Sequence, residues 1–147
     1  MKTSLLALIC LSVLTGSLSL AADGKSAEQV VRDYAATWNS GDRDGFFATQ
    51  QADIHKYLRD SVTAEFKLTT SGLESVKQKY LPLFAKASRV TVQIVSLTTL
   101  GEIVVTRDRV TNEAENYAAN EMTMYQVRDG KIINIWYLGR EVAQPPG

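Results

Sequence analysis

The sequence contains very little cysteine and histidine: among its 147 residues there is one of each, Cys10 and His55. Cys10 falls in an apolar stretch near the start of the chain that we expect to be removed. The remaining chain would then have no thiol for a disulfide or for thiolate chemistry. Transition-metal sites are built mainly from cysteine and histidine ligands. We therefore expect no metal and no cofactor.

An excess of positive charge is also lacking. The sequence has 16 Lys and Arg against 16 Asp and Glu, and no basic run or stripe. Proteins that bind nucleic acid neutralise phosphates with clustered Lys and Arg. We expect no nucleic-acid partner.

Long apolar runs are confined to residues 5–14. Lys2 precedes this run, and Ser19-Leu20-Ala21 places small residues where a signal peptidase reads them. The run is shorter than the roughly 20 residues that span a bilayer. The pattern predicts a secretory signal peptide over residues 1–21, a secreted or periplasmic location, and no membrane association after cleavage.

The rest of the chain has the length of one domain with one core. We place this domain at residues 22–142. The last residues, 143–147, contain Pro145-Pro146 and are expected to form a disordered tail.

Two helices are predicted near the start of the domain. Ser26-Ala27-Glu28-Gln29 is a capping-box pattern. Val30, Tyr34 and Trp38 then recur every four residues, which is typical of one apolar helical stripe. Gly41-Asp42 supplies a glycine stop and the cap of a second, short helix.

The remainder alternates between extended and helical patterns. Residues 53–67 are expected to be extended, and an apolar stripe from Leu73 to Phe84 predicts a third helix. Residues rich in Val, Thr and Ile then indicate four consecutive strands joined by short turns, at 89–100, 103–111, 117–128 and 131–138. An antiparallel meander with helices on one face gives an α+β fold.

The register of the last hairpin decides which side chains share a face. A strict two-residue turn would put Trp136 beside Thr123. We favour a turn with a bulge at Gly130, and its expected pairs are Tyr125 with Ile133, Thr123 with Ile135 and Glu121 with Tyr137.

In the order of these parts the chain resembles the NTF2-like superfamily, in its SnoaL-like and ketosteroid-isomerase-like branch. The resemblance covers about residues 26–139, and its carriers are 34–42, 73–84, 107–110 and 125–132. It implies a cone, in which a strongly bent antiparallel sheet packs against N-terminal helices around a pocket, often in a dimer. It implies no single activity, because the scaffold carries isomerases, cyclases, hydrolases, transport factors and non-catalytic binders.

Ketosteroid isomerase combines a carboxylate base with a tyrosine and a protonated acid that donate to the dienolate oxygen. By its spacing to Gly41, Tyr34 matches the tyrosine of that enzyme. The base falls near Tyr57 or Leu58 and the acid near Thr123, so neither carboxyl group is present. Limonene-epoxide hydrolase, of the same scaffold, uses an arginine flanked by two aspartates, which the consecutive residues Arg107-Asp108-Arg109 do not reproduce.

Our candidate catalytic residues are Asp108, Tyr34 and His55. Asp108 alternates with apolar neighbours, and burial on a pocket face would raise its pKa and suit it to proton transfer; the alternative is a surface carboxylate in a salt bridge. His55 is the one side chain with an ordinary pKa near neutrality, and facing Asp108 it would complete a general base. Tyr34 would donate a hydrogen bond to a developing oxyanion.

These residues favour binding of a small hydrophobic or amphipathic molecule, and they leave open whether isomerase- or hydrolase-type proton transfer follows. The expected pocket residues are Trp38, Tyr57, Glu121, Thr123, Tyr125, Ile135 and Tyr137. The alternative is a non-catalytic dimerisation or protein-association module that uses the outer sheet face, and in either case we expect a homodimer. The apolar residues expected on that outer face are Met122, Met124, Trp136 and Leu138.

Overall fold

The computed structural model describes residues 24–86 and 88–143. The predicted signal peptide over residues 1–21 and most of the predicted tail lie outside these ranges. The described helices and strands are α1 (Ala27–Ser40), α2 (Arg43–Ala48), β1 (Gln50–Arg59), β2 (Phe66–Ser71), α3 (Leu73–Phe84), β3 (Thr91–Leu100), β4 (Ile103–Asn112), a short 3-10 turn (Glu113–Glu115), β5 (Tyr117–Arg128) and β6 (Lys131–Val142).

The first two helices begin and end where the sequence predicts. The Ser26 hydroxyl accepts a hydrogen bond from the backbone N–H of Gln29 at 3.2 Å. Gly41 ends α1 in the left-handed conformation, with φ of 76°, which glycine adopts without a steric penalty. Asp42 then caps α2 by accepting from the N–H of Gly45 at 2.9 Å.

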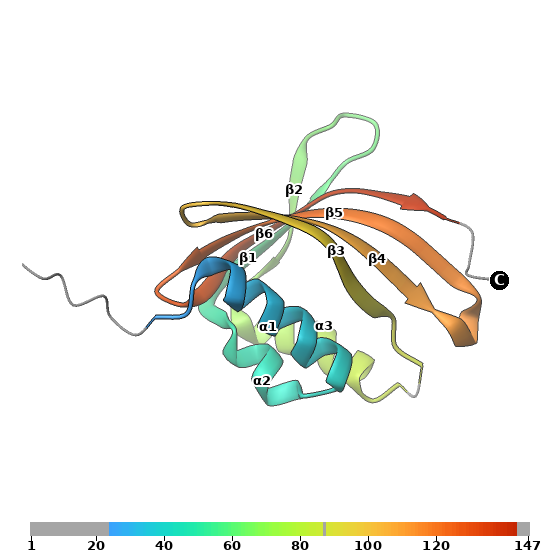
Figure 1. Ribbon diagram of the computed structural model, residues 1–147, viewed down its shortest axis with the longest axis horizontal. Helices are drawn as coiled ribbons and strands as arrows, with labels where there is room; N and C mark the ends of the chain where they lie inside the picture. The colour runs from blue at the N-terminus through green and yellow to red at the C-terminus, as the bar shows by residue number, and fades with distance from the viewer. Residues whose placement is uncertain (1–23, 87, 144–147) are drawn as a thin grey trace, which may run out of the picture.

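Six strands form one sheet in the order β2-β1-β6-β5-β4-β3. Neighbouring strands are antiparallel, except that β1 runs parallel to β6. The three helices pack on one face of this sheet (Figure 1). The expected α+β class, with a curled sheet and helices on one side, is confirmed.

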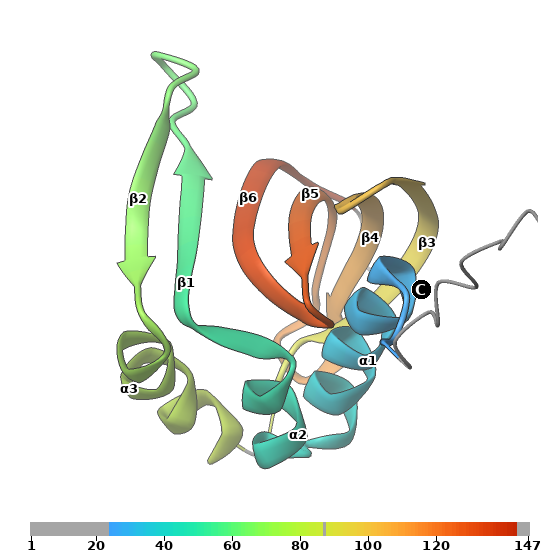
Figure 2. The same cartoon turned by 90° about the vertical axis from the view of Figure 1, so that its left-hand side faces the viewer.

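Bulges bend the sheet toward the helices. Register shifts leave one extra residue in β3, at Val95, and two in β6, at Ile133 and Leu138. A bulge of this kind increases local twist and bends its strand. Figure 2 shows the result: β3 to β6 curl around the helices, and the β1–β2 hairpin extends away at the other end.

The predicted pairs of the last hairpin are wrong, by two residues for Tyr125 and Thr123 and by three for Glu121. The turn is the strict two-residue type, since Arg128 pairs with Lys131, and the bulge comes later, at Ile133. A shift of two preserves the face of Thr123 and Tyr125, whereas Ile133 is the bulged residue and the buried side chain beside it is that of Ile132. The observed pairs are Tyr125 with Ile135, Thr123 with Tyr137 and Glu121 with Arg140.

The solid core lies at the α2 end of the concave face. Phe46 is 1% exposed and contacts five other aromatic rings, and burial of such a side chain stabilises the fold by about 1.5–3 kcal/mol. Val31, Ile54 and Ile132 are fully buried beside it. In the part of the chain that the structure describes, none of the helices has the length and apolar character that crossing a membrane requires.

Candidate functional site

A cavity of about 270 Å³ lies between the concave face of the sheet and helices α1 and α3. Its walls are mostly apolar, and its polar groups come from separate elements. Helices supply two tyrosines and a lysine, and strands β4 to β6 supply two carboxylates, a threonine, two more tyrosines and an arginine. These residues are Tyr34, Lys79, Tyr80, Asp108, Glu121, Thr123, Tyr125, Tyr137 and Arg140.

Asp108 projects into this cavity from the middle of β4. Its side chain is 3% exposed. The Thr106 hydroxyl donates to Oδ2 at 2.7 Å, while Oδ1 has no hydrogen-bond partner within the described residues. Burial raises the pKa of Asp108 from 3.8 to about 6; the Thr106 hydrogen bond opposes this and the Glu121 charge adds to it. A buried carboxylate with a free oxygen at a cavity wall is able to exchange a proton with a bound molecule.

Three charged residues share one row across the sheet, because Asp108 pairs with Glu121 on β5 and Glu121 pairs with Arg140 on β6. The Arg140 guanidinium forms an ion pair with the Glu121 carboxylate at 2.6 Å. Arg140 is largely exposed, so the row runs from the cavity interior to its mouth. The carboxylate of Glu121 is thereby compensated, whereas that of Asp108 is not.

Four tyrosines line the cavity together with Asp108, Tyr34 and Tyr80 from the helices and Tyr125 and Tyr137 from the sheet. The hydroxyls of Tyr80 and Tyr137 lie 3.2 Å apart in a hydrogen bond. Burial raises the pKa values of Tyr34, Tyr125 and Tyr137 well above 10. These three groups are therefore protonated at neutral pH and serve as hydrogen-bond donors.

The structure brings together most of the residues that the sequence analysis selected. Tyr34, Asp108 and the predicted pocket residues on β5 line the cavity. Trp38 and Tyr137 line it too, and Trp38 is fixed by its indole N–H, which donates to the Val90 carbonyl at 2.9 Å. The burial of Asp108 excludes the alternative that it is a surface carboxylate in a salt bridge.

Three selected residues do not reach the cavity. His55 and Tyr57 pair with Asn134 and Trp136 of β6, on the convex face. There the Tyr57 ring stacks on Trp136 at 5.5 Å, and the condition for a general base of His55 with Asp108, that the two face each other, is not met. Ile135 is fully buried in the core and is not part of the cavity wall.

The inward residue of β1 is Lys56, which the sequence analysis missed. Lys56 pairs with Ile135 and so shares the concave face with Tyr125. The signal was its alternation with Ile54, but we assigned the aromatic pair at 55 and 57 to the interior instead. Tyr80 and Arg140 were also missed.

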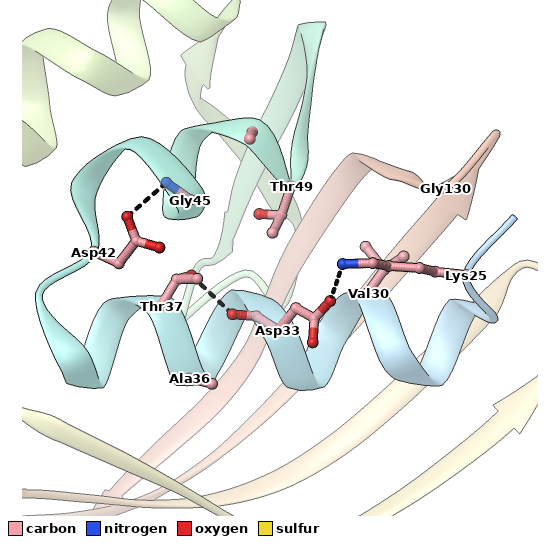
Figure 3. A pocket seen from close by; sticks show the side chains of 10 residues that line it. Lys25, Val30, Asp33, Ala36, Thr37, Asp42, Gly45, Thr49 and Gly130 are labelled. Atoms are coloured by element: carbon pink, nitrogen blue, oxygen red, sulfur yellow. Dashed lines mark hydrogen bonds and ion pairs between the residues drawn. The ribbon is translucent and has the colours of Figure 1, made fainter.

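A wider hollow of about 550 Å³ lies beside α1 and α2, and its polar groups maintain local structure (Figure 3). Lys25 pairs with Asp33, and Asp42 caps α2. The hydrogen bonds from Lys25 and Gln29 lower the pKa of Asp33, so this carboxylate is a weaker base than Asp108. The smaller cavity is therefore the better candidate site. Within residues 24–86 and 88–143, no group of three His, Cys, Asp or Glu side chains is arranged to hold a metal ion.

Comparisons with known proteins agree with this fold. Rv0760c from Mycobacterium tuberculosis superposes with a TM-score of 0.66 at 17% identity, covering 83% of this chain and 99% of that one. Its complex with estradiol-17β-hemisuccinate gives 0.62 at 18%, covering 77% and 92%. A computationally designed 17-OHP binder gives 0.62 at 18%, covering 80% and 95%. At such identities the likeness shows the fold alone.

No curated protein matches the sequence. The model of the SnoaL-like domain, in contrast, matches residues 31–135, which is more than half of the chain and includes both walls of the cavity. The protein is therefore a member of the SnoaL-like domain family, within the NTF2-like superfamily.

Proposed function

We propose that this protein binds a small apolar or amphipathic molecule in the cavity and exchanges a proton with it through Asp108. The observation that carries the proposal is the free, buried Oδ1 of Asp108 at the wall of an unfilled cavity. The opposite wall presents tyrosine hydroxyls to the oxygen of such a molecule. A base and an oxyanion donor on opposite walls suit removal of a proton from a carbon next to a carbonyl.

The pKa of the carboxylate fits this role. With a pKa of about 6, Asp108 is mostly ionised at neutral pH yet is a stronger base than an exposed carboxylate. Tyr34 keeps its proton because burial raises its pKa. It can therefore donate to the oxygen on which negative charge develops.

The cavity size limits the ligand. About 270 Å³ is just below the usual size of ligand pockets, which range from about 300 to 1,000 Å³. A groove along the end of β1, lined by Leu58, Arg59 and Leu138, continues from the mouth and shares Tyr80 and Tyr137 with the cavity. A larger ligand would place its apolar head inside and its remaining part in this groove. The complex of Rv0760c with estradiol-17β-hemisuccinate supports an amphipathic ligand of this kind on this scaffold.

The test is carbon–hydrogen exchange. The protein is incubated in D₂O with a panel of cyclic ketones that includes 2-tetralone, and the loss of the α-proton signal is followed by NMR. We expect accelerated exchange with the native protein and loss of that acceleration in Asp108→Asn. Asp129→Asn changes an exposed turn aspartate and serves as the matched control. Equal exchange in Asp108→Asn and the native protein would contradict the role of Asp108.

We also propose the alternative in which the convex face of the sheet forms a homodimer. An apolar row, Tyr57, Trp136 and Met124, crosses three neighbouring strands in register, and Met122 beside it is 46% exposed. Sedimentation at increasing concentration should show a dimer that Trp136→Glu dissociates. A native protein that stays monomeric would contradict this proposal.

We further propose that residues 1–21 direct secretion to the periplasm or medium. Lys2, the apolar run and the small residues before Ala22 support this proposal. The mass of the protein recovered from the exported fraction should correspond to a chain that begins at Ala22. Recovery of the uncleaved chain from the cytoplasm would contradict it.

A further inference from the structure

Lys56 is a buried charge for which the proposed reaction gives no role. Its side chain is 1% exposed, and among the described residues no carboxylate forms an ion pair with it. Lysine is almost never fully buried without a partner, because removal of an ammonium from water is costly. Whatever stabilises this charge must therefore come from neighbouring aromatic and hydroxyl groups.

Aromatic rings surround the Lys56 ammonium. Nζ lies 4.1 Å from the centroid of the Tyr80 ring, 5.6 Å from that of Tyr34 and 5.8 Å from that of Phe46. A cation over an aromatic face is attracted by the negative face of the ring. Three rings from α1, α2 and α3 thus offset part of the desolvation cost.

The same ammonium donates a hydrogen bond to the Tyr34 hydroxyl at 3.3 Å. An ammonium can only donate, so it uses a lone pair of the tyrosine oxygen and leaves the hydroxyl hydrogen for another acceptor. The hydroxyls of Tyr80 and Tyr137 are the other hydrogen-bonding neighbours of Tyr34. All three tyrosines line the cavity and Lys56 does not, so a ligand oxygen would accept a hydrogen bond from this group of hydroxyls. A charged donor behind the hydroxyl polarises the O–H bond and strengthens its donation.

We propose that Lys56 is a positioning residue: its ammonium lies outside the cavity wall and polarises the hydroxyls of the tyrosines that line the cavity. The cavity would therefore prefer ligands whose oxygen carries or develops negative charge, such as phenolates and enolates. This inference rests on the proposed function, because it requires a ligand in the cavity. It adds a residue outside the cavity wall and a preference for the anionic form of the ligand.

The groups that face Lys56 agree with a charge directed at the tyrosines. Tyr34 on α1, Tyr80 on α3 and the Thr70 position on β2 present hydroxyls, and the charge of Lys79 on α3 also acts on the Lys56 ammonium. Burial and the Lys79 charge lower the pKa of Lys56, while Tyr80 raises it. Burial alone would raise the pKa of Tyr80, but the Lys56 ammonium and the hydrogen bond with Tyr137 reverse that shift and lower it.

The experiment uses 4-nitrophenol, whose phenol and phenolate forms absorb at different wavelengths. The apparent pKa of the bound probe is measured with the native protein, with Lys56→Met, which keeps the length of the side chain without its charge, and with Lys131→Met as an exposed control. We expect the native protein and the control to hold the probe as phenolate. In Lys56→Met the preference for phenolate over phenol should fall by about tenfold or more, which raises the probe's pKa by about one unit.

The outcomes separate the two proposals. Binding by both proteins with an unchanged probe pKa would overturn the role of Lys56 and leave the cavity function intact. Absence of binding by the native protein would overturn the cavity function and this inference with it. If Lys56→Met does not fold, the side-chain ¹⁵N signal of Lys56 in the native complex decides: an ammonium signal at neutral pH supports the role, and a neutral amine overturns it.

Discussion

Substitution of Asp108 by asparagine should stabilise the protein at neutral pH although it removes the proposed base. In the folded protein the pKa of Asp108 is about 6, compared with 3.8 for an unperturbed aspartate. The folded state therefore binds the proton more tightly than the unfolded state does. Stability from this group is highest in acid and is lost as the pH rises from about 4 through 6.

The shift of about two pKa units corresponds to at most about 3 kcal/mol, and we reduce this to roughly 2 kcal/mol because the cavity admits water that screens the charge. Asparagine cannot ionise, so Asp108→Asn avoids this cost. The Thr106 hydroxyl, which donates to Oδ2 at 2.7 Å, can donate equally to an amide oxygen. The amount by which Asp108→Asn raises the free energy of unfolding above that of the native protein should therefore be roughly 2 kcal/mol larger at pH 8 than at pH 4.

The assay is thermal or urea unfolding of the native protein and Asp108→Asn at both pH values, with Asp129→Asn as the control. A difference of 2 kcal/mol corresponds to roughly 5–10 °C in Tm for a domain of this size. The control should show no comparable dependence on pH. A variant that is less stable than the native protein by the same amount at pH 8 and pH 4 would refute the reasoning.

Two further substitutions test the cavity and the fold separately. Tyr34→Phe should reduce any Asp108-dependent exchange by about 10²-fold, as expected for loss of one oxyanion donor, while a dissociation constant that rises with no loss of rate would contradict that role. Gly41→Ala should destabilise the fold by about 1 kcal/mol or more in urea unfolding, because φ is +76° and the new Cβ would lie 2.8 Å from Arg89 Nη2. At Gly101, φ is +58° and a new Cβ would have no atom within 4 Å, so Gly101→Ala should lose only the unfolding free energy that the positive φ costs. Equal losses of unfolding free energy at both positions would show that the Arg89 contact contributes nothing.

Local sequence signals were sufficient for the helices and for the faces of the last strands. The Ser26 cap and the Gly41 stop depend on neighbouring residues alone, and the structure confirms both. Asp108 was placed by alternation along one strand, a signal that a bulge elsewhere in the sheet does not disturb. The same alternation gave the correct face to Thr123 and Tyr125, although the predicted pairs were shifted by two.

The contacts of β1 depend on long-range pairing that no local pattern encodes. This strand runs parallel to β6, whose partner positions lie about 80 residues later in the chain. The inward face of β1 therefore follows from the position of Ile135, and His55 was assigned to the wrong face for that reason. Alternation with Ile54 could have placed Lys56 on the inward face, but no local pattern shows what surrounds its ammonium there, three aromatic rings from three separate helices.

The most direct measurement of the central claim is a titration of the Asp108 carboxyl carbon by ¹³C NMR, without ligand and with 4-nitrophenol bound. We predict a midpoint near pH 6 in the free protein and a displaced midpoint when the probe occupies the cavity. A midpoint near 4 that the probe leaves unchanged would show that Asp108 is solvated and remote from any bound molecule, and would contradict the proposed site.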